Sequence, residues 1–181
     1  MRLKSFPTGV GSSWTYEWED RWSNKIDTVV VRVTARLDST AAGPVTIWVF
    51  EHAYGPDTLF MLETGDTIRF LYWLDTASWS DTYLFPLRVG AVWKKYPLTD
   101  SCWVSAQEAV SVPAGRYSGA FRVEDTWGYL NAYGVVSTWF VPDVGIVIED
   151  HWELNLGPGP NYVRRLLEYE IVEDGAVPID R

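Results

Sequence analysis

Hydrophobic and polar residues alternate along most of this chain with the period of two that is typical of β-strands. Between residues 28 and 37, the side chains of Val29, Val31, Val33, Ala35 and Leu37 are expected to share one face, and mostly polar residues the other. Similar alternation, or a run of β-branched and aromatic residues, marks about ten segments. These are residues 14–19, 28–37, 46–51, 59–63, 67–74, 104–112, 117–123, 135–141, 146–154 and 162–172.

Short turn sequences separate the predicted strands. Thr64-Gly65-Asp66, Pro113-Ala114-Gly115 and Pro142-Asp143-Val144-Gly145 each lie between two such segments, as expected for hairpins. The segment 162–172 alternates although its Arg-Arg-Leu-Leu-Glu stretch would tolerate a helix, and no convincing amphipathic helix occurs elsewhere. The pattern therefore predicts an all-β fold, an antiparallel meander that curls into a curved sheet, half-barrel or barrel-like shape.

One nine-residue motif occurs twice. Phe6-Pro7-Thr8-Gly9-Val10-Gly11-Ser12-Ser13-Trp14 and Phe85-Pro86-Leu87-Arg88-Val89-Gly90-Ala91-Val92-Trp93 both read F-P-x-x-V-G-x-x-W. Proline and glycine suit a bend just before a strand, which the flanking Phe and Trp can anchor in the core. The motif predicts one domain over residues 1–181 with two similar halves, 5–84 and 85–173, and a loose acidic tail at 174–181.

Composition narrows the possible partners. Aromatic residues make up 15% of the chain, including 11 Trp and 10 Tyr, which suits strands first and a binding surface second. The net charge of −9 argues against nucleic acid, which requires clustered Lys and Arg. Cys102 is the single cysteine, so an internal disulfide is impossible.

Targeting signals and cofactor motifs are absent from the sequence. No apolar run is long enough for a transmembrane helix. Met1-Arg2-Leu3-Lys4 does not lead into a signal-peptide core, so an exported protein would carry its signal outside this sequence. The chain has no phosphate-binding loop, nucleophile elbow or dinucleotide fingerprint, and we expect no cofactor.

Three short motifs in order resemble a known class of proteins. The F-P-x-x-V-G-x-x-W motif is followed by Val112-Pro113-Ala114-Gly115-Arg116-Tyr117 and by Pro142-Asp143-Val144-Gly145-Ile146-Val147. Over residues 5–172 the chain resembles bacterial secreted or lipid-anchored domains of unknown function, and it departs from them in the Trp- and Tyr-rich stretch 127–139. The resemblance implies a curved antiparallel sheet or half-barrel, shaped like the periplasmic lipoprotein carriers, and an extracytoplasmic location; it implies no catalytic residue.

Two sets of side chains are candidates for a site. Glu149, His151 and Glu153 alternate, so they would project from one strand face as ligands of a divalent metal or as an acid–base group. The alternative is a solvated face opposite Ile146, Ile148, Trp152 and Leu154. The aromatic candidates for ligand binding are Trp14, Tyr16, Trp18, Trp22, Trp73, Trp79, Trp127 and Trp139, and the alternative is that these rings form the core.

Three functions follow from these candidates. The first is a non-enzymatic extracytoplasmic domain that holds an apolar or saccharide ligand, or an envelope protein, on the concave face of its sheet. The second is a hydrolase using carboxylates and one His on that face, and the third is a structural module of an envelope assembly. Exposed aromatic rings favour the first over the third, and a pocket of convergent ionisable groups favours the second.

Overall fold

The computed structural model contains twelve β-strands and describes residues 6–38, 40, 43–52, 55–71, 80–95, 101–129, 132–154 and 161–173. The strands are β1 (Ser13–Asp20), β2 (Lys25–Leu37), β3 (Val45–His52), β4 (Gly55–Thr64), β5 (Thr67–Leu71), β6 (Ser80–Leu84), β7 (Val92–Lys94), β8 (Ser101–Val112), β9 (Gly115–Tyr129), β10 (Ala132–Val141), β11 (Gly145–Leu154) and β12 (Tyr162–Glu170). Trp73, Trp79 and the predicted tail at 174–181 lie outside the described residues.

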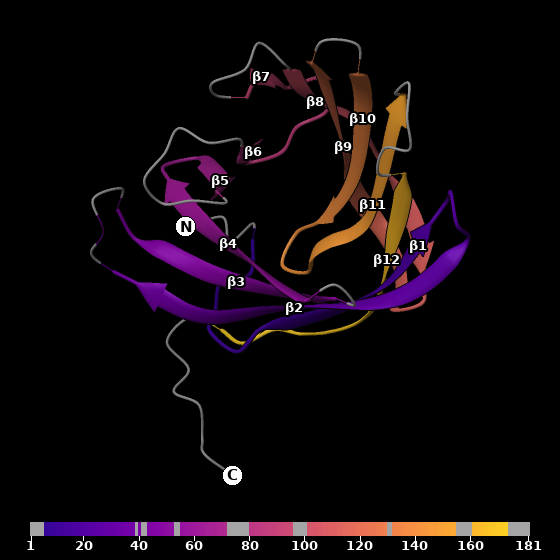
Figure 1. Cartoon of the computed structure of the whole chain (residues 1–181). Helices are drawn as coiled ribbons and strands as arrows, with labels where there is room; N and C mark the ends of the chain where they lie inside the picture. Colours follow the sequence, from indigo (N-terminus) through magenta and orange to yellow (C-terminus); the bar gives the residue numbers. More distant parts are fainter. Residues whose placement is uncertain are drawn as a thin grey trace.

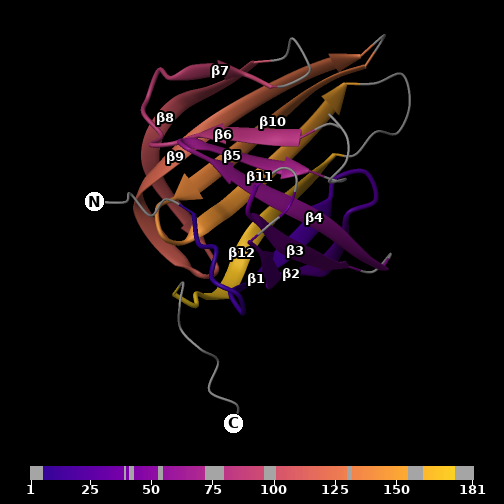
Figure 2. The same cartoon turned by 90° about the vertical axis from the view of Figure 1, so that its left-hand side faces the viewer.

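All twelve strands belong to one antiparallel sheet. Their order is β6-β5-β4-β3-β2-β1-β12-β11-β10-β9-β8-β7, so each half of the chain is a six-stranded meander and the first and last strands pair in the middle. The sheet curves into a nearly closed, barrel-like shape with an inner and an outer face (Figures 1 and 2). The predicted fold class is confirmed. The two strands that the sequence did not predict, β6 and β7, are the short strands at the two edges.

The core is a cluster of aromatic rings between the two halves. The Phe6 ring lies 5.4 Å from Trp48 and 5.6 Å from Phe70 in the first half, and 5.3 Å from Phe140 in the second, measured between ring centroids. Aromatic residues contribute large apolar areas and favour the edge-on and offset contacts seen here. Phe6 therefore joins the inner faces of both halves.

The two copies of the repeated motif make the same backbone hydrogen bonds. Gly11 N donates to Val33 O, and Gly90 N to Val104 O, both at 2.9 Å. In return, Val33 N donates to Ser12 O and Val104 N to Ala91 O. Both glycines have positive φ, 98° and 86°, which makes the bend that the sequence predicts before each strand. The division into duplicated halves stays a prediction, and this matched pair of corners supports it.

Both of the other two motifs form turns that contact the middle of the sheet. At the β8–β9 turn, Ala114 N donates to Leu166 O of β12 at 3.0 Å. At the β10–β11 turn, the indole N–H of Trp14 donates to Val144 O at 2.6 Å, and the Tyr16 hydroxyl donates to Ile146 O at 2.9 Å. The three motifs that carry the resemblance therefore form corners and turns that hydrogen-bond to other strands of the sheet.

The described residues include no helix long and apolar enough to cross a membrane.

Candidate functional site

Strand β1 has three aromatic side chains on one face, in a row that begins in the core and ends at a partly accessible position. Trp14 and Tyr16 are buried, and the Trp14 ring, 1% exposed, stacks on Trp48 at 4.9 Å. Trp18 lies on the same face two residues further on, and its ring is only half-buried. The predicted aromatic stripe exists, and it passes from core to accessible surface within one strand.

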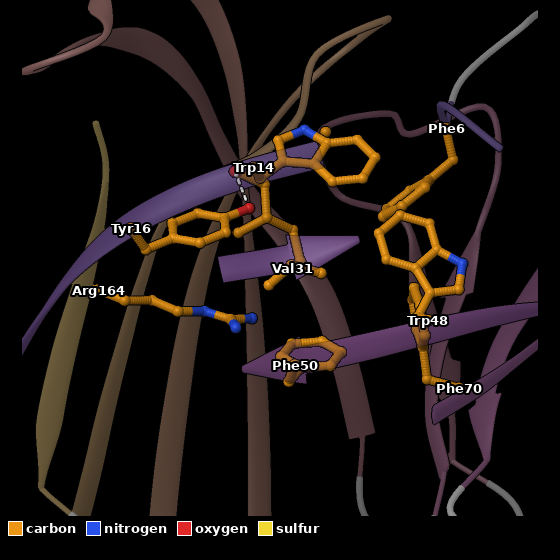
Figure 3. A pocket seen from close by; sticks show the side chains of 10 residues that line it. Phe6, Trp14, Tyr16, Val31, Trp48, Phe50, Phe70 and Arg164 are labelled. Carbon is orange, nitrogen blue, oxygen red and sulfur yellow. Dashed lines mark hydrogen bonds between the residues drawn. The ribbon is translucent and has the colours of Figure 1, made fainter. Parts of the chain in front are cut away.

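A small cavity lies beside the buried part of this stripe (Figure 3). Its volume is about 30 Å³, enough for one or two water molecules. The aromatic rings of the first half form most of its wall, and the single charged side chain that reaches it is Arg164 of β12. The guanidinium carbon of Arg164 lies 5.1 Å from the centre of the Tyr16 ring and 5.7 Å from that of Phe50, within the range of cation–π attraction.

Arg164 forms a buried ion pair with Glu149 of β11. The two residues are directly opposite in the β11–β12 register, and Arg164 Nη2 lies 2.6 Å from Glu149 Oε2. The Tyr162 hydroxyl donates to the other carboxylate oxygen at 2.7 Å. The side chains of Arg164 and Glu149 are only 13% and 12% exposed, so their charges stabilise one another with little help from water.

The surroundings of Glu149 keep it ionised. Burial alone would raise the pKa of its carboxyl group, but the Arg164 charge and the hydrogen bonds from Tyr162 and Arg164 hold that pKa below its ordinary value. Burial also raises the pKa of the Tyr16 hydroxyl well above its ordinary range. A general acid needs a carboxyl pKa that is raised toward neutrality, so Glu149 is not suited to proton donation.

Next to this pair, four aromatic rings form a continuous row, which we call the aromatic ladder: Trp18, Tyr162, His151 and Trp127. The centroid distance is 5.6 Å from Trp18 to Tyr162, 5.1 Å from Tyr162 to His151, and 6.3 Å from His151 to Trp127. All four side chains are half-buried. The row therefore presents partly accessible ring surface across β1, β12, β11 and β9.

Strand register explains why these rings meet. Tyr162 is opposite His151, and Trp18 is opposite Arg164, so the rings and the ion pair share the inner face. Trp127 reaches His151 across the intervening strand β10 because the residue opposite Trp127 is Gly134. A methyl group at Gly134 would overlap the Trp127 indole.

A second ion pair lies on the same face. Asp125 is opposite Val136, which in turn is opposite His151, and the Asp125 carboxylate pairs with Lys95 after β7. Both side chains are largely buried. The inner face near the aromatic ladder thus alternates aromatic rings with charges that are neutralised in pairs.

The remaining aromatic candidates lie elsewhere. Trp22 is 61% exposed in the turn after β1, where its backbone N–H donates to Asp20 Oδ1. Trp139 is half-buried on the outer face: its indole donates to Glu108 at 2.7 Å and the Arg122 guanidinium lies over its ring at 4.9 Å. Of the six predicted binding residues that the structure describes, Trp18 and Trp127 are therefore the accessible pair that the inner face brings together.

Glu149, His151 and Glu153 share one face of β11 as predicted, but the interpretation of that face as solvated is wrong. It is the inner face: Glu153 is buried, whereas Trp152 and Leu154 on the opposite face are exposed. The register of β11 with β12 places Glu149 beside Arg164 on this inner face, which alternation along β11 alone does not reveal. Within the described part of the chain, no three His, Cys, Asp or Glu side chains form a group that could hold a metal ion.

Sequence reasoning missed Tyr162 and Arg164. Both belong to the segment 162–172, which its alternation predicts as a strand although its Arg-Arg-Leu-Leu-Glu stretch would tolerate a helix. In β12, Val163 and Leu166 are the buried residues, although their spacing of three places them on opposite faces of the strand. A register shift against β1 between Leu166 and Glu168 interrupts the alternation further along. The available signal was Arg164 itself, because an arginine that a strand buries needs a carboxylate partner.

Two solved structures share this fold. One is a candidate exported protein of Bacteroides fragilis with a YmcC-like fold; it has 14% sequence identity and a TM-score of 0.57 over 93% of this chain and 99% of its own. The other is a candidate lipoprotein of Parabacteroides distasonis, with 12% identity and a TM-score of 0.57 over 94% and 100%. No protein-family profile and no curated protein matches this chain.

Proposed function

We propose that this protein is a non-enzymatic extracytoplasmic domain that binds a ligand on the aromatic ladder of its inner face. The observation that supports this most strongly is the continuous row of four half-buried rings on the inner face, with centroids 5.1–6.3 Å apart. Partly exposed aromatic rings in contact with one another provide stacking area at little cost in side-chain entropy. One structural neighbour is a candidate exported protein and the other a candidate lipoprotein, which supports the proposed location.

The ionisable groups of the inner face favour binding over hydrolysis. The carboxylates of Glu149 and Asp125 each pair with a cation, and the pKa of Glu149 is lowered rather than raised. A carboxyl group that acts as a general acid in hydrolysis needs a pKa near the working pH. Paired, ionised carboxylates instead serve to hold the geometry of the face and to accept hydrogen bonds from a ligand.

Fluorine NMR on protein labelled with 5-fluorotryptophan tests this proposal. The labelled protein is mixed in turn with soluble oligosaccharides and with short acyl amphiphiles, and each resonance is assigned by a single Trp→Phe substitution. We expect at least one compound to shift the Trp18 and Trp127 resonances while leaving Trp22, the exposed control, unchanged. The proposal would be contradicted if no compound shifted the Trp18 and Trp127 resonances. It would also be contradicted if the compounds shifted only the resonances of Trp22 or of the outer-face Trp139.

A further inference from the structure

We infer that the ligand of the aromatic ladder is a neutral saccharide rather than an acyl chain or an acidic glycan. This inference rests on the proposed function of the ladder as a binding surface. It follows from three properties of the inner face: the space available, the mixture of rings and polar groups, and the balance of charge.

The core cavity next to Arg164, which none of the four ladder rings lines, is too small for an acyl chain. The cavity that Arg164 shares with the core rings has a volume of about 30 Å³. Pockets that bury small organic ligands have volumes of roughly 300–1,000 Å³, an order of magnitude more. Trp14 and Trp48, which line the cavity, stack on each other and are at most 3% exposed, so admitting a chain would require the core to open. A ligand that lies on the face, instead of entering the core, fits this geometry.

The polar groups between the rings fit a ligand with hydroxyl groups. Glu149 and Arg164 lie directly beside Trp18 and Tyr162 on the same face, and Asp125, paired with Lys95, lies on that face two strands from His151, across β10. An acyl chain lying over these ion pairs would cover the small part of them that is still accessible without offering any hydrogen bond, which is unfavourable. A sugar ring can place its C–H face on an aromatic ring and direct its hydroxyls to carboxylate and guanidinium groups.

The balance of charge favours a neutral ligand over an anionic one. The two cations of this face, Arg164 and Lys95, are each paired with a carboxylate, so the pairs add no net positive charge. The protein as a whole has a net charge of −9. An acidic saccharide would be repelled by this field and would have to compete with Glu149 or Asp125 for its cation.

Isothermal titration calorimetry with four compounds tests the inference: maltohexaose and chitohexaose as neutral saccharides, a hyaluronan hexasaccharide as an acidic one, and palmitate as an acyl chain. We expect binding of at least one neutral hexasaccharide. Trp127→Ala and, independently, Trp18→Ala should weaken that binding about tenfold, the loss of roughly one aromatic stacking contact. Trp22→Ala, outside the ladder, should leave it unchanged, and near-UV circular dichroism verifies that each variant is folded.

The possible outcomes separate this inference from the proposed function. If palmitate or hyaluronan binds in a manner sensitive to Trp18 and Trp127 while both neutral saccharides do not, the saccharide inference is wrong and the ladder remains a binding surface. If neutral saccharides bind but the two ladder variants have no effect, the ladder is not the site. If none of the four compounds binds, the inference is rejected, and the fluorine NMR experiment decides on the ladder itself.

Discussion

The aromatic side chains of the inner face fall into two regions with different surroundings. Around Phe6, Trp14 and Trp48, rings pack on rings, and their polar atoms, where bonded, meet backbone carbonyls. Around the ladder, rings lie beside ion pairs and stay half-buried. The two regions meet on β1, where Trp14 is in the core and Trp18 in the ladder. An aromatic-rich sequence therefore does not define one role for its tryptophans; their neighbours across the sheet do.

The largest expected effect comes from the core region. Trp14→Ala removes a fully buried indole, its stacking on Trp48 and its hydrogen bond to Val144 O. We expect the free energy of unfolding to fall by about 3–5 kcal/mol, measured by urea denaturation. Trp22→Ala is the matched control, with an expected change within about 0.5 kcal/mol. Similar losses for both variants would show that the Trp14 environment does not differ from a surface turn.

Breaking the ion pair between the two regions should be the next most costly change. Arg164→Met leaves the Glu149 carboxylate buried beside Tyr162 without its cation. Removing one partner of a buried pair destabilises proteins by about 3 kcal/mol or more. The double variant Arg164→Met/Glu149→Gln removes the stranded charge and should recover part of the loss. If the double variant is less stable by the sum of the two single losses, the two side chains do not interact.

The packing that positions the Trp127 ring in the ladder can be tested at Gly134, which is not itself one of the four ladder residues. Gly134→Ala places a methyl group where the Trp127 indole lies over β10. We expect a loss of about 1–3 kcal/mol from overpacking, together with a shift of the Trp127 fluorine resonance. Gly119→Ala, in β9 with more space around it, is the control. An unchanged Trp127 resonance would contradict the placement of this ring.

The stability of the ion pair should depend on pH in one direction. Because the pKa of Glu149 is lowered in the folded protein from its ordinary 4.5, its stabilising contribution is present above pH 4.5 and is lost as pH falls through the folded-state pKa. The difference in unfolding free energy between the wild type and Glu149→Gln should therefore narrow as the pH is lowered from 6 to 3. A difference that stays constant over this range would show that Glu149 is not stabilised as an anion.

Much of the fold could be predicted from the sequence because alternation is a local property. The valines 29, 31 and 33 are buried on one face as expected, but Leu37 is exposed because a register shift between Val33 and Ala35 interrupts the pattern. The edge strand β7 has three residues, too few to show a period, and β6 reads Ser-Asp-Thr-Tyr-Leu, with its two hydrophobic residues adjacent and no alternation. The repeated motif and the three hairpin motifs were visible because each depends on its own glycine and proline residues.

The candidate site could be predicted only in part. Trp18, Trp127 and His151 were recognised as unusual, yet as members of two separate sets. Their meeting with Tyr162 depends on the pairing of β11 with β12 and on the missing side chain at Gly134, and both are long-range properties. Whether a carboxylate such as Glu149 faces water or an arginine depends on its partner strand, which alternation within β11 cannot show.

The division of the tryptophans into core and ladder can be measured directly in the free protein. With all 11 tryptophans labelled with 5-fluorotryptophan, a soluble gadolinium chelate broadens the resonances of rings that solvent can reach. We predict that Trp18 and Trp127 broaden together with the exposed Trp22, and that Trp14 and Trp48 stay sharp. Protection of Trp18 and Trp127 equal to that of Trp14 would contradict the central claim, because a ring that solvent cannot reach cannot serve as a binding surface.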